Sequence, residues 1–342
     1  MQASRRFSRS LLRVAPRRSV WTMDSGYKVR KMPVEEEIPN PLLQNVRLGC
    51  VQMQVQLVKE ANLMRASKAI ATMAKNGSKI VVLPECFNSP YGTNNFPKFA
   101  ETLLPSPPSK KASPSFHMLA DAAKRNNVYL VGGSIPERDP EMSSRFYNTC
   151  LTFNPKGELI DTFRKVHLFD INIPDKITFR ESEVLSPGNK ISLVPMPPYG
   201  TVAIAICYDI RFPELATIAA RKGAFALIYP GAFNLTTGGL HWELLGRSRA
   251  LDNQVYVALC SPARDETANY NAWGHSMILD PMGRISVKAD HDETALSFEL
   301  SSKVIQDSRD NIPLNKQRRF DVYPDITKGD IQFEEPPEST FD

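Results

Sequence analysis

Hydrophobic and polar residues alternate along most of the chain in a pattern that predicts strands separated by helices. Short apolar runs between turn residues are typical of buried strands, and apolar residues every three or four positions are typical of helices. The predicted strands cover residues 46–53, 79–83, 128–134, 146–153, 158–164, 201–206, 224–229, 255–260, 274–279, 284–288 and 294–299. The predicted helices cover residues 58–76, 114–126, 212–222, 241–252 and 301–308. This alternation predicts an α/β protein with two sheets.

The two ends of the chain lack this pattern. Residues 24–44 mix charges with prolines, which predicts a linker before one domain over residues 45–325, and prolines among acids predict a loose tail over 326–342. Residues 1–23 contain six arginines, several serines and no acid. Such a segment is typical of a mitochondrial transit peptide, so we expect the mature protein in the matrix. The alternative is a basic tail, or an extension that translation skips by starting at Met23, which would leave the protein in the cytoplasm.

Composition and charge limit the classes of partner. Of 342 residues, 42% are hydrophobic, which is enough for a sizeable core. No run approaches the roughly 18 uncharged apolar residues of a membrane span, so we expect no membrane partner. The net charge of +5 falls to −1 without the six arginines of residues 1–23. The domain itself therefore lacks the basic surface that nucleic-acid binding requires.

The cysteines and histidines do not follow a metal-binding pattern. The chain has five cysteines, at Cys50, Cys86, Cys150, Cys207 and Cys260, and none forms a CxxC pair. An odd number of scattered cysteines predicts free thiols in a reducing compartment. His241, His275 and His291 have no partner at ligand spacing along the sequence, so we expect neither a metal nor another cofactor.

Three reactive side chains each follow a predicted strand, namely Glu85, Lys165 and Cys207. Cys207 also precedes a helical pattern, which places its thiol at a strand-to-helix elbow near free backbone N–H groups. Such groups lower the pKa of a thiol, and we therefore expect a thiolate. Taken singly, Cys207 is typical of an inert buried cysteine, and Glu85 and Lys165 are typical of surface charges. Together they provide a base, a fixed positive charge and a nucleophile, which amide hydrolysis through a thioester requires.

The segments around these residues resemble the three signatures of the nitrilase (carbon–nitrogen hydrolase) superfamily. The signatures are LPECF at 83–87, RKVHLF at 164–169 and CYDIRFPE at 207–214, and the resemblance runs from about residue 46 to 323. Four further segments, CFNSPYG at 86–92, FRESE at 179–183, YPGAFNLTTG at 229–238 and ALDNQVY at 250–256, are similar to the omega-amidase branch.

This resemblance implies a fold and an activity. The fold is a four-layer α-β-β-α sandwich, usually assembled as a homodimer. The activity is hydrolysis of alpha-ketoglutaramate and alpha-ketosuccinamate to a 2-oxo dicarboxylic acid and ammonia. Glu85 would be the base, Lys165 would stabilise the intermediate and Cys207 would be acylated. Glu181 would support the site, and the backbone N–H of Tyr208 would help to form the oxyanion hole.

Arg211 is the main candidate for binding the substrate carboxylate. It lies four residues after Cys207, about one helical turn further, so it can face the same pocket. An arginine fork matches a carboxylate, and in the family this position is linked to the substrate carboxylate. The alternative is a structural ion pair with Glu214 or Asp209.

Three further residues are candidate substrate contacts. Tyr91 lies in a Ser-Pro-Tyr-Gly turn that is suited to a loop tip covering the pocket. Phe233 and Thr237 follow a strand end, where ligands of α/β proteins gather. Ordinary loop packing is the alternative for all three. His167 is close to Lys165 in sequence, and we expect it to be structural.

Two other functions remain open. The chain can be a different carbon–nitrogen hydrolase, such as a nitrilase, a carbamoyl-amino-acid hydrolase or a deaminated-glutathione amidase, because these enzymes share the triad. The Tyr91 turn and residues 232–237 favour the omega-amidase. The second alternative is a binding protein on an inactive hydrolase fold, which the presence of all three triad residues disfavours.

Overall fold

The computed structural model describes residues 39–336 of the chain. The predicted transit peptide at residues 1–23, most of the predicted linker and residues 337–342 of the predicted tail lie outside the described residues. Residues 326–336 follow no regular secondary structure but lie against the domain, where the Ile191 N–H donates to the Gln332 carbonyl at 2.8 Å.

Two sheets form the middle of the domain. The first sheet contains β1 (Val46–Gln52), β2 (Ile80–Val82), β3 (Tyr129–Val131), β4 (Ile135–Arg138), β5 (Phe146–Phe153), β6 (Leu159–Arg164) and β15 (Thr294–Leu300). Its strand order is β15-β1-β2-β3-β5-β4, and β6 also pairs with β5. The second sheet contains β9 (Ser192–Met196), β10 (Gly200–Ile204), β11 (Ala224–Pro230), β12 (Tyr256–Cys260), β13 (Met277–Leu279) and β14 (Ile285–Lys288). Its strand order is β14-β13-β12-β11-β10-β9. A separate hairpin pairs β7 (Asp170–Ile173) with β8 (Ile177–Arg180).

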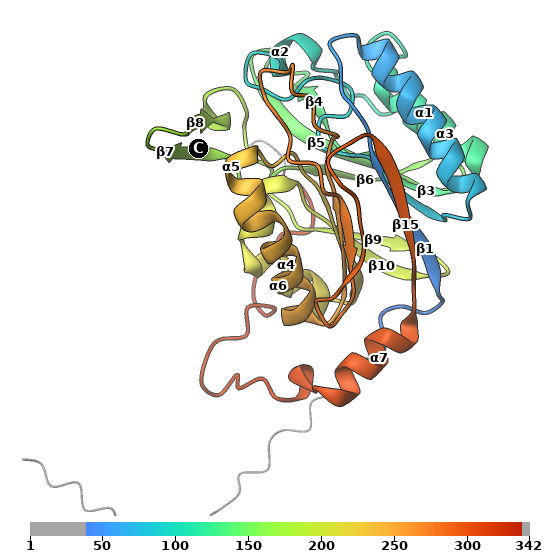
Figure 1. The fold of residues 1–342 in the computed structure, drawn as a ribbon, viewed down its shortest axis with the longest axis vertical. Helices are drawn as coiled ribbons and strands as arrows, with labels where there is room; N and C mark the ends of the chain where they lie inside the picture. The colour runs from blue at the N-terminus through green and yellow to red at the C-terminus, as the bar shows by residue number, and fades with distance from the viewer. Residues whose placement is uncertain (1–38, 337–342) are drawn as a thin grey trace, which may run out of the picture. The chain divides into compact units, whose positions relative to one another are not determined.

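Helices cover the outer face of each sheet (Figure 1). The α-helices are α1 (Lys59–Lys75), α2 (Phe96–Phe99), α3 (Pro114–Asn126), α4 (Pro213–Arg221), α5 (Leu235–Thr237), α6 (Glu243–Asn253) and α7 (Ser302–Asn311). Helices α1 and α3 lie against the first sheet, and α4 and α6 lie against the second, with the two sheets facing each other between them. This is the four-layer α-β-β-α sandwich that the resemblance implied. None of the helices within residues 39–336 combines the length and apolar character of a membrane span.

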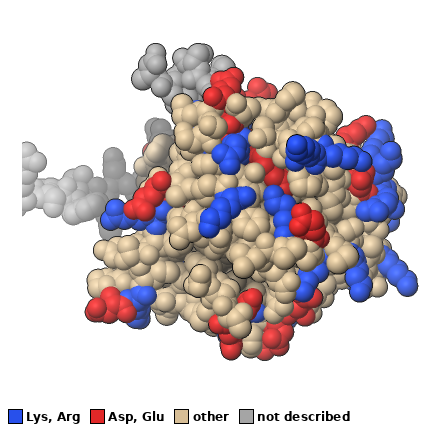
Figure 2. All heavy atoms as spheres, turned by 90° about the horizontal axis from the view of Figure 1, so that it is seen from above, with Lys and Arg blue, Asp and Glu red and all other residues tan. Residues whose placement is uncertain are grey.

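Burial on both faces explains the continuous apolar strands. Successive residues of a strand point to opposite faces. In β1, Cys50 belongs to the core between the two sheets, whereas Val51 packs with Ile70 of α1 and Leu119 of α3. A strand covered on both sides has no polar face, so its sequence is apolar throughout. On the surface, acidic and basic side chains are interspersed over the face shown in Figure 2.

Candidate active site

Glu85, Lys165 and Cys207 converge in the domain although they are distant in the sequence. Glu85 lies three residues beyond β2, Lys165 directly follows β6, and Cys207 lies three residues beyond β10. All three are buried. The Lys165 Nζ lies 3.1 Å from the Glu85 Oε1, and the Cys207 thiol lies close enough to Glu85 for the carboxylate to shift its pKa. The structure therefore brings the three sequence-predicted residues into one contact network.

Cys207 occupies a strained elbow between β10 and α4. Its φ is +49°, in the left-handed region that residues with a side chain rarely adopt, and it opens a 3₁₀-helix over Cys207–Arg211. Asp209 holds this turn, because its Oδ2 accepts from the Ile206 N–H at 2.9 Å and its own N–H donates to the Ile206 carbonyl at 3.0 Å. Gly231 passes so close that a Cβ there would lie 3.2 Å from the Cys207 Cα. The elbow presents the thiol next to the opening N–H groups of the helix, including that of Tyr208.

Asp209 also ties the elbow to the segment that contains Lys165. Its Oδ1 accepts from the backbone N–H of His167 at 2.8 Å and lies 2.8 Å from the His167 Nδ1. The His167 ring stacks on Phe212 with 3.6 Å between centroids. His167 thus links two segments of the site, in agreement with the structural role predicted for it.

Glu85 accepts hydrogen bonds on both oxygens. Its Oε1 accepts from the Asn148 side-chain amide at 2.8 Å and from Lys165, and its Oε2 accepts from the backbone N–H of Ala232 at 2.7 Å. These three donors fix the orientation of the carboxylate. The sequence did not predict Asn148, because it lies within β5 and carries no motif of its own.

Glu181 holds the other side of Lys165. The Lys165 Nζ lies 3.0 Å from one Glu181 carboxylate oxygen and 2.9 Å from the other. The Tyr91 hydroxyl donates to the Glu181 Oε1 at 2.6 Å, and the Phe169 N–H donates to its Oε2 at 2.7 Å. Lys165 is therefore fixed between two buried carboxylates, as the predicted supporting role of Glu181 requires.

The charge states of Glu85, Lys165, Glu181 and Cys207, which together form the Cys207 cluster, correct the prediction of a thiolate. Burial raises the pKa of the Cys207 thiol well above its ordinary value, and the Glu85 carboxylate raises it further, while Lys165 opposes both. Cys207 therefore rests as a protonated thiol, and the expected free thiolate is wrong. The helix N–H groups do not outweigh the loss of water and the adjacent anion. Burial raises the pKa of Glu85, whereas for Lys165 the two glutamates outweigh burial and raise its pKa.

Arg211 forms no ion pair with any acid among residues 39–336. Its guanidinium lies 5.3 Å from the ring centroid of Tyr208 and 4.9 Å from that of Phe233. Its only side-chain hydrogen bond in this part of the chain joins Nη1 to the His241 Nδ1 at 3.2 Å, and its Nε has no partner there. The alternative of an ion pair with Glu214 or Asp209 is therefore wrong. A half-buried cation without an acid next to it can bind an anionic ligand.

Tyr91, Phe233 and Thr237 were the other predicted substrate contacts, and the structure shows what each of them touches. Tyr91 is buried rather than exposed at a loop tip, and its hydroxyl is already bound to Glu181. The Phe233 ring lies against the Arg211 guanidinium. The Thr237 hydroxyl donates to the Asn234 side chain at 3.2 Å, so it can only accept from a ligand.

A cavity of about 430 Å³ borders Glu85, Tyr91 and Tyr270. The sequence did not predict Tyr270, whose ring lies 4.5 Å from that of Tyr91 and whose hydroxyl donates to the Ala232 carbonyl at 2.6 Å. Tyr270 comes from the loop after β12, which carries no recognised signature. Its aromatic side chain lines this cavity together with Glu85 and Tyr91.

All five cysteines are free and buried. His275 and His291 have no partner at ligand spacing along the sequence, but the fold places both beside Asp290. The ligand atoms of these three residues all lie within 4.8 Å of one another. This group is separate from the Cys207 cluster, and none of the predicted catalytic residues belongs to it.

Known proteins with similar sequences and folds act on carbon–nitrogen bonds. The sequence matches the carbon-nitrogen hydrolase family over residues 47–310. An omega-amidase of Xenopus tropicalis is 52% identical over 277 residues, which cover 81% of this chain and 96% of the relative. An omega-amidase of Saccharomyces cerevisiae is 51% identical over 288 residues, which cover 83% of this chain and 97% of the relative.

A solved structure extends this similarity to three dimensions. The crystal structure of a Saccharomyces cerevisiae protein, a member of branch 10 of the nitrilase superfamily, superposes with a TM-score of 0.75 at 48% sequence identity. The superposition covers 83% of this chain and 100% of that chain. The similarity therefore spans the two sheets and the helices that position the Cys207 cluster.

Proposed function

The chain belongs to the carbon–nitrogen hydrolase family, and from this premise we propose that it is an omega-amidase. Its substrates are small 2-oxo acids with a terminal amide, such as alpha-ketoglutaramate and alpha-ketosuccinamate. Its products are the 2-oxo dicarboxylic acid and ammonia. The relatives that share about half of its sequence over most of the domain carry this name.

One observation carries the proposal: the Cys207 thiol and the Lys165 ammonium both lie beside the buried Glu85 carboxylate. A protonated thiol needs a base at the moment of attack, and Glu85 is in place to take the proton. Lys165 supplies a positive charge that compensates the negative charge that develops on the substrate oxygen. The three groups together fit acyl transfer to sulfur.

Acylation follows from this arrangement. The Cys207 Sγ bonds to the amide carbonyl carbon while the thiol proton passes to Glu85. Lys165 and the Tyr208 N–H stabilise the resulting oxyanion. The carbon–nitrogen bond then breaks as Glu85 gives its proton to the nitrogen, which leaves as ammonia. The acyl group remains on Cys207 as a thioester.

Deacylation uses the same groups in the reverse order. A water molecule attacks the thioester carbon, and Glu85 takes a proton from that water. The carbon–sulfur bond breaks as the proton passes from Glu85 to the Cys207 Sγ. The acid product leaves, and the thiol is restored. Glu181 keeps Lys165 oriented through both halves of the reaction, because both of its carboxylate oxygens contact the ammonium.

Arg211 provides the selectivity for an acidic substrate. It lies within electrostatic reach of Cys207, and no described acid neutralises it. The carboxylate at one end of a 2-oxo acid would pair with this guanidinium, which places the amide at the other end near the thiol. Phe233 supports the guanidinium from one side.

A substrate panel tests the proposed function. Ammonia release should be measured with alpha-ketoglutaramate, an N-carbamoyl amino acid, deaminated glutathione, a neutral short-chain amide and a nitrile. We expect the highest kcat/KM with alpha-ketoglutaramate. A higher value with deaminated glutathione, the carbamoyl compound or the nitrile would reassign the protein to that branch. Ammonia release from none of them would favour a binding protein on an inactive fold.

We further infer that two copies of the chain assemble through α6. Leu240, Leu244 and Leu251 lie on one side of this helix and the turn before it, and each is at least 46% exposed. Contiguous exposed leucines are typical of an interface, and pairing with a second copy would cover the stripe on both. Light scattering after gel filtration should report a dimer for the wild type and a monomer for Leu244→Asp. Met64→Asp, at a position on α1 that is even more exposed than Leu244, should remain dimeric, and a monomeric wild type would refute the assembly.

Residues 1–23, which lie outside the described residues, are proposed to direct the chain to the mitochondrial matrix. The arginine-rich, acid-free composition supports this proposal. A fusion of residues 1–30 to a fluorescent protein should localise to mitochondria. A diffuse cytosolic signal would favour a cytoplasmic form that starts at Met23.

A further inference from the structure

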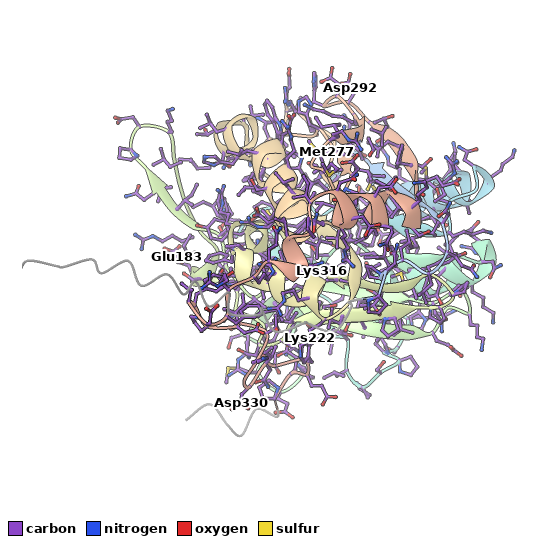
Figure 3. All side chains as sticks on the ribbon, turned by 90° about the horizontal axis from the view of Figure 1, so that it is seen from below. Glu183, Lys222, Met277, Asp292, Lys316 and Asp330 are labelled. Carbon is purple, nitrogen blue, oxygen red and sulfur yellow. The ribbon has the colours of Figure 1, made fainter. Side chains whose placement is uncertain are left out.

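A second cluster of potential ligands lies on the second sheet, apart from the groups that act in amide hydrolysis. His275 lies two residues before β13, and Asp290 and His291 lie just beyond β14. These strands are antiparallel neighbours with Met277 opposite Lys288, so the start of one meets the end of the other. The turn that follows this cluster is at the surface, and Figure 3 shows Asp292 at the outer edge, with the buried Met277 inside.

The spacing of the three side chains fits a small cation. The Asp290 Oδ1 lies 3.0 Å from the His291 Nδ1 and 3.7 Å from the His275 Nδ1. A tetrahedral Zn²⁺ with bonds of about 2.0–2.2 Å separates its ligand atoms by roughly 3.3–3.6 Å. The two observed distances lie on either side of this range. Movements of a few tenths of an ångström would bring these two pairs to the spacing of zinc ligands, and the two imidazole nitrogens lie within 4.8 Å of each other.

A buried amide fixes the backbone that holds these ligands. The side-chain amide of Gln52, which is fully buried, donates to the carbonyl of Asp290 at 2.6 Å and to that of Asp292 at 2.7 Å. The backbone N–H of His275 donates to the Asp290 carbonyl at 3.1 Å. The φ of His275 is +53°, an uncommon conformation that directs its ring toward the turn. The ligand set is thus held from the interior, as a metal site requires.

The cluster is open on its outer side. The Asp290 side chain is 75% exposed and that of His291 is 37% exposed, while His275 closes the inner side at 16%. An ion can enter from solvent, and water can occupy its remaining position. The two nearby cations have partners outside the site, because Lys288 is bound to Glu243 at 2.8 Å and Arg264 donates to the Trp273 carbonyl at 3.0 Å.

We propose that His275, Asp290 and His291 bind one divalent transition-metal ion, with Zn²⁺ as the best fit. Two imidazole nitrogens and one carboxylate oxygen suit Zn²⁺, Ni²⁺ or Cu²⁺, whereas Mg²⁺ and Ca²⁺ prefer oxygen ligands. The ion would replace the direct contact between Asp290 and the two imidazoles, and it would carry no step of amide hydrolysis.

An ion at this position would stabilise a segment that packs against Phe233, a predicted substrate contact. The His275 ring contacts Trp273, with 4.5 Å between centroids. The Trp273 N–H donates to the Phe233 carbonyl at 2.7 Å, and the Trp273 ring leaves no room for a side chain at Gly238. Binding to the folded state alone stabilises a protein by mass action, so the ion should raise the melting temperature.

The test uses the untagged full chain with Cys207→Ala, so that the active-site thiol cannot bind metal. Titration with Co²⁺, followed by its visible absorption, and with Zn²⁺, followed by calorimetry, should show one site per chain. His291→Ala should weaken the binding of Co²⁺ and of Zn²⁺ by at least about tenfold, because it removes a ligand from an exposed position without disturbing the core. His117→Ala, at a histidine remote from the cluster, should bind as the parent does.

Melting curves provide the second readout. Zn²⁺ should raise the melting temperature of the Cys207→Ala protein and of its His117→Ala variant, but not that of the His291→Ala variant. Mg²⁺ should have no effect on any of them. The proposal is overturned if Zn²⁺ does not bind saturably, or if His291→Ala binds it as tightly as the parent.

Discussion

Replacing Glu85 by glutamine should separate its catalytic role from its contribution to stability. The glutamine keeps the size of the side chain but replaces one acceptor oxygen by a donor NH₂ group. Glu85 accepts from Asn148 and Lys165 on one oxygen and from the Ala232 N–H, 2.7 Å away, on the other. Whichever way the amide turns, its NH₂ faces a donor, so at least one buried donor loses its partner. An unsatisfied buried group costs about 1–3 kcal/mol.

The loss of activity should be much larger than this loss of stability. General acid–base catalysis contributes about 10²–10⁴-fold, so Glu85→Gln should lower kcat for ammonia release by roughly that factor. The variant should remain folded, with a near-normal circular dichroism spectrum and a lower melting temperature. The assay is steady-state ammonia release from alpha-ketoglutaramate, in parallel with urea unfolding.

Glu101→Gln is the matched control. Glu101 is also buried and accepts from Lys59 at 2.9 Å and from the Ser113 and Ser115 hydroxyls at 2.7 and 2.6 Å, outside the Cys207 cluster. This variant should lose stability but keep a near-normal kcat. If folded Glu85→Gln keeps kcat within about tenfold of the wild type, Glu85 is not the base that activates the thiol.

Three further predictions concern the same pocket. Cys207→Ala should lower ammonia release by several orders of magnitude, because no thioester can form, whereas Cys86→Ala should keep most of the wild-type activity. More than a few per cent residual activity in Cys207→Ala would contradict the mechanism. Arg211→Lys should lower kcat/KM for alpha-ketoglutaramate roughly 30- to 160-fold, which corresponds to an interaction loss of about 2–3 kcal/mol. The kcat/KM for a neutral amide should change little. Equal losses for the two substrates would show that Arg211 has a structural role. Burial raises the pKa of Glu85 above its ordinary value of 4.5, and the Glu181 carboxylate raises it further. Activity should therefore fall as the pH drops through this raised pKa, because protonated Glu85 cannot take the thiol proton. Glu181→Gln should move this acid limb to lower pH, and an unmoved limb would assign it to another group.

The layered fold was predictable because its strands are buried on both faces. Each of the predicted strands and helices has a counterpart within a few residues, from β1 to α7. Four strands were missed, namely β4, β7, β8 and β9. Strands β4 and β9 contain Pro136 and Pro195 and lie at the edges of their sheets, where proline is tolerated but the apolar pattern is broken. The β7–β8 hairpin is half exposed, so its pattern is that of a polar loop.

The candidate site was predictable only where residues follow strand ends in recognisable motifs. Glu85, Lys165 and Cys207 satisfy that condition, whereas Asn148 contacts Glu85 from 63 residues away and belongs to no motif. The charge state of the thiol was not predictable, because it depends on complete burial beside a carboxylate rather than on the local elbow. The contacts of Tyr270 depend in the same way on how a loop packs after the fold has formed.

The most direct test of the account is the mass of the enzyme quenched in acid within milliseconds of mixing with alpha-ketoglutaramate. The account predicts a species heavier by the acyl group of the substrate, with the added mass on the peptide that contains Cys207. The adduct should be absent from Cys207→Ala and should accumulate when deacylation is slowed. Rapid ammonia release with no adduct under any condition, or an adduct on another residue, would contradict the thioester mechanism.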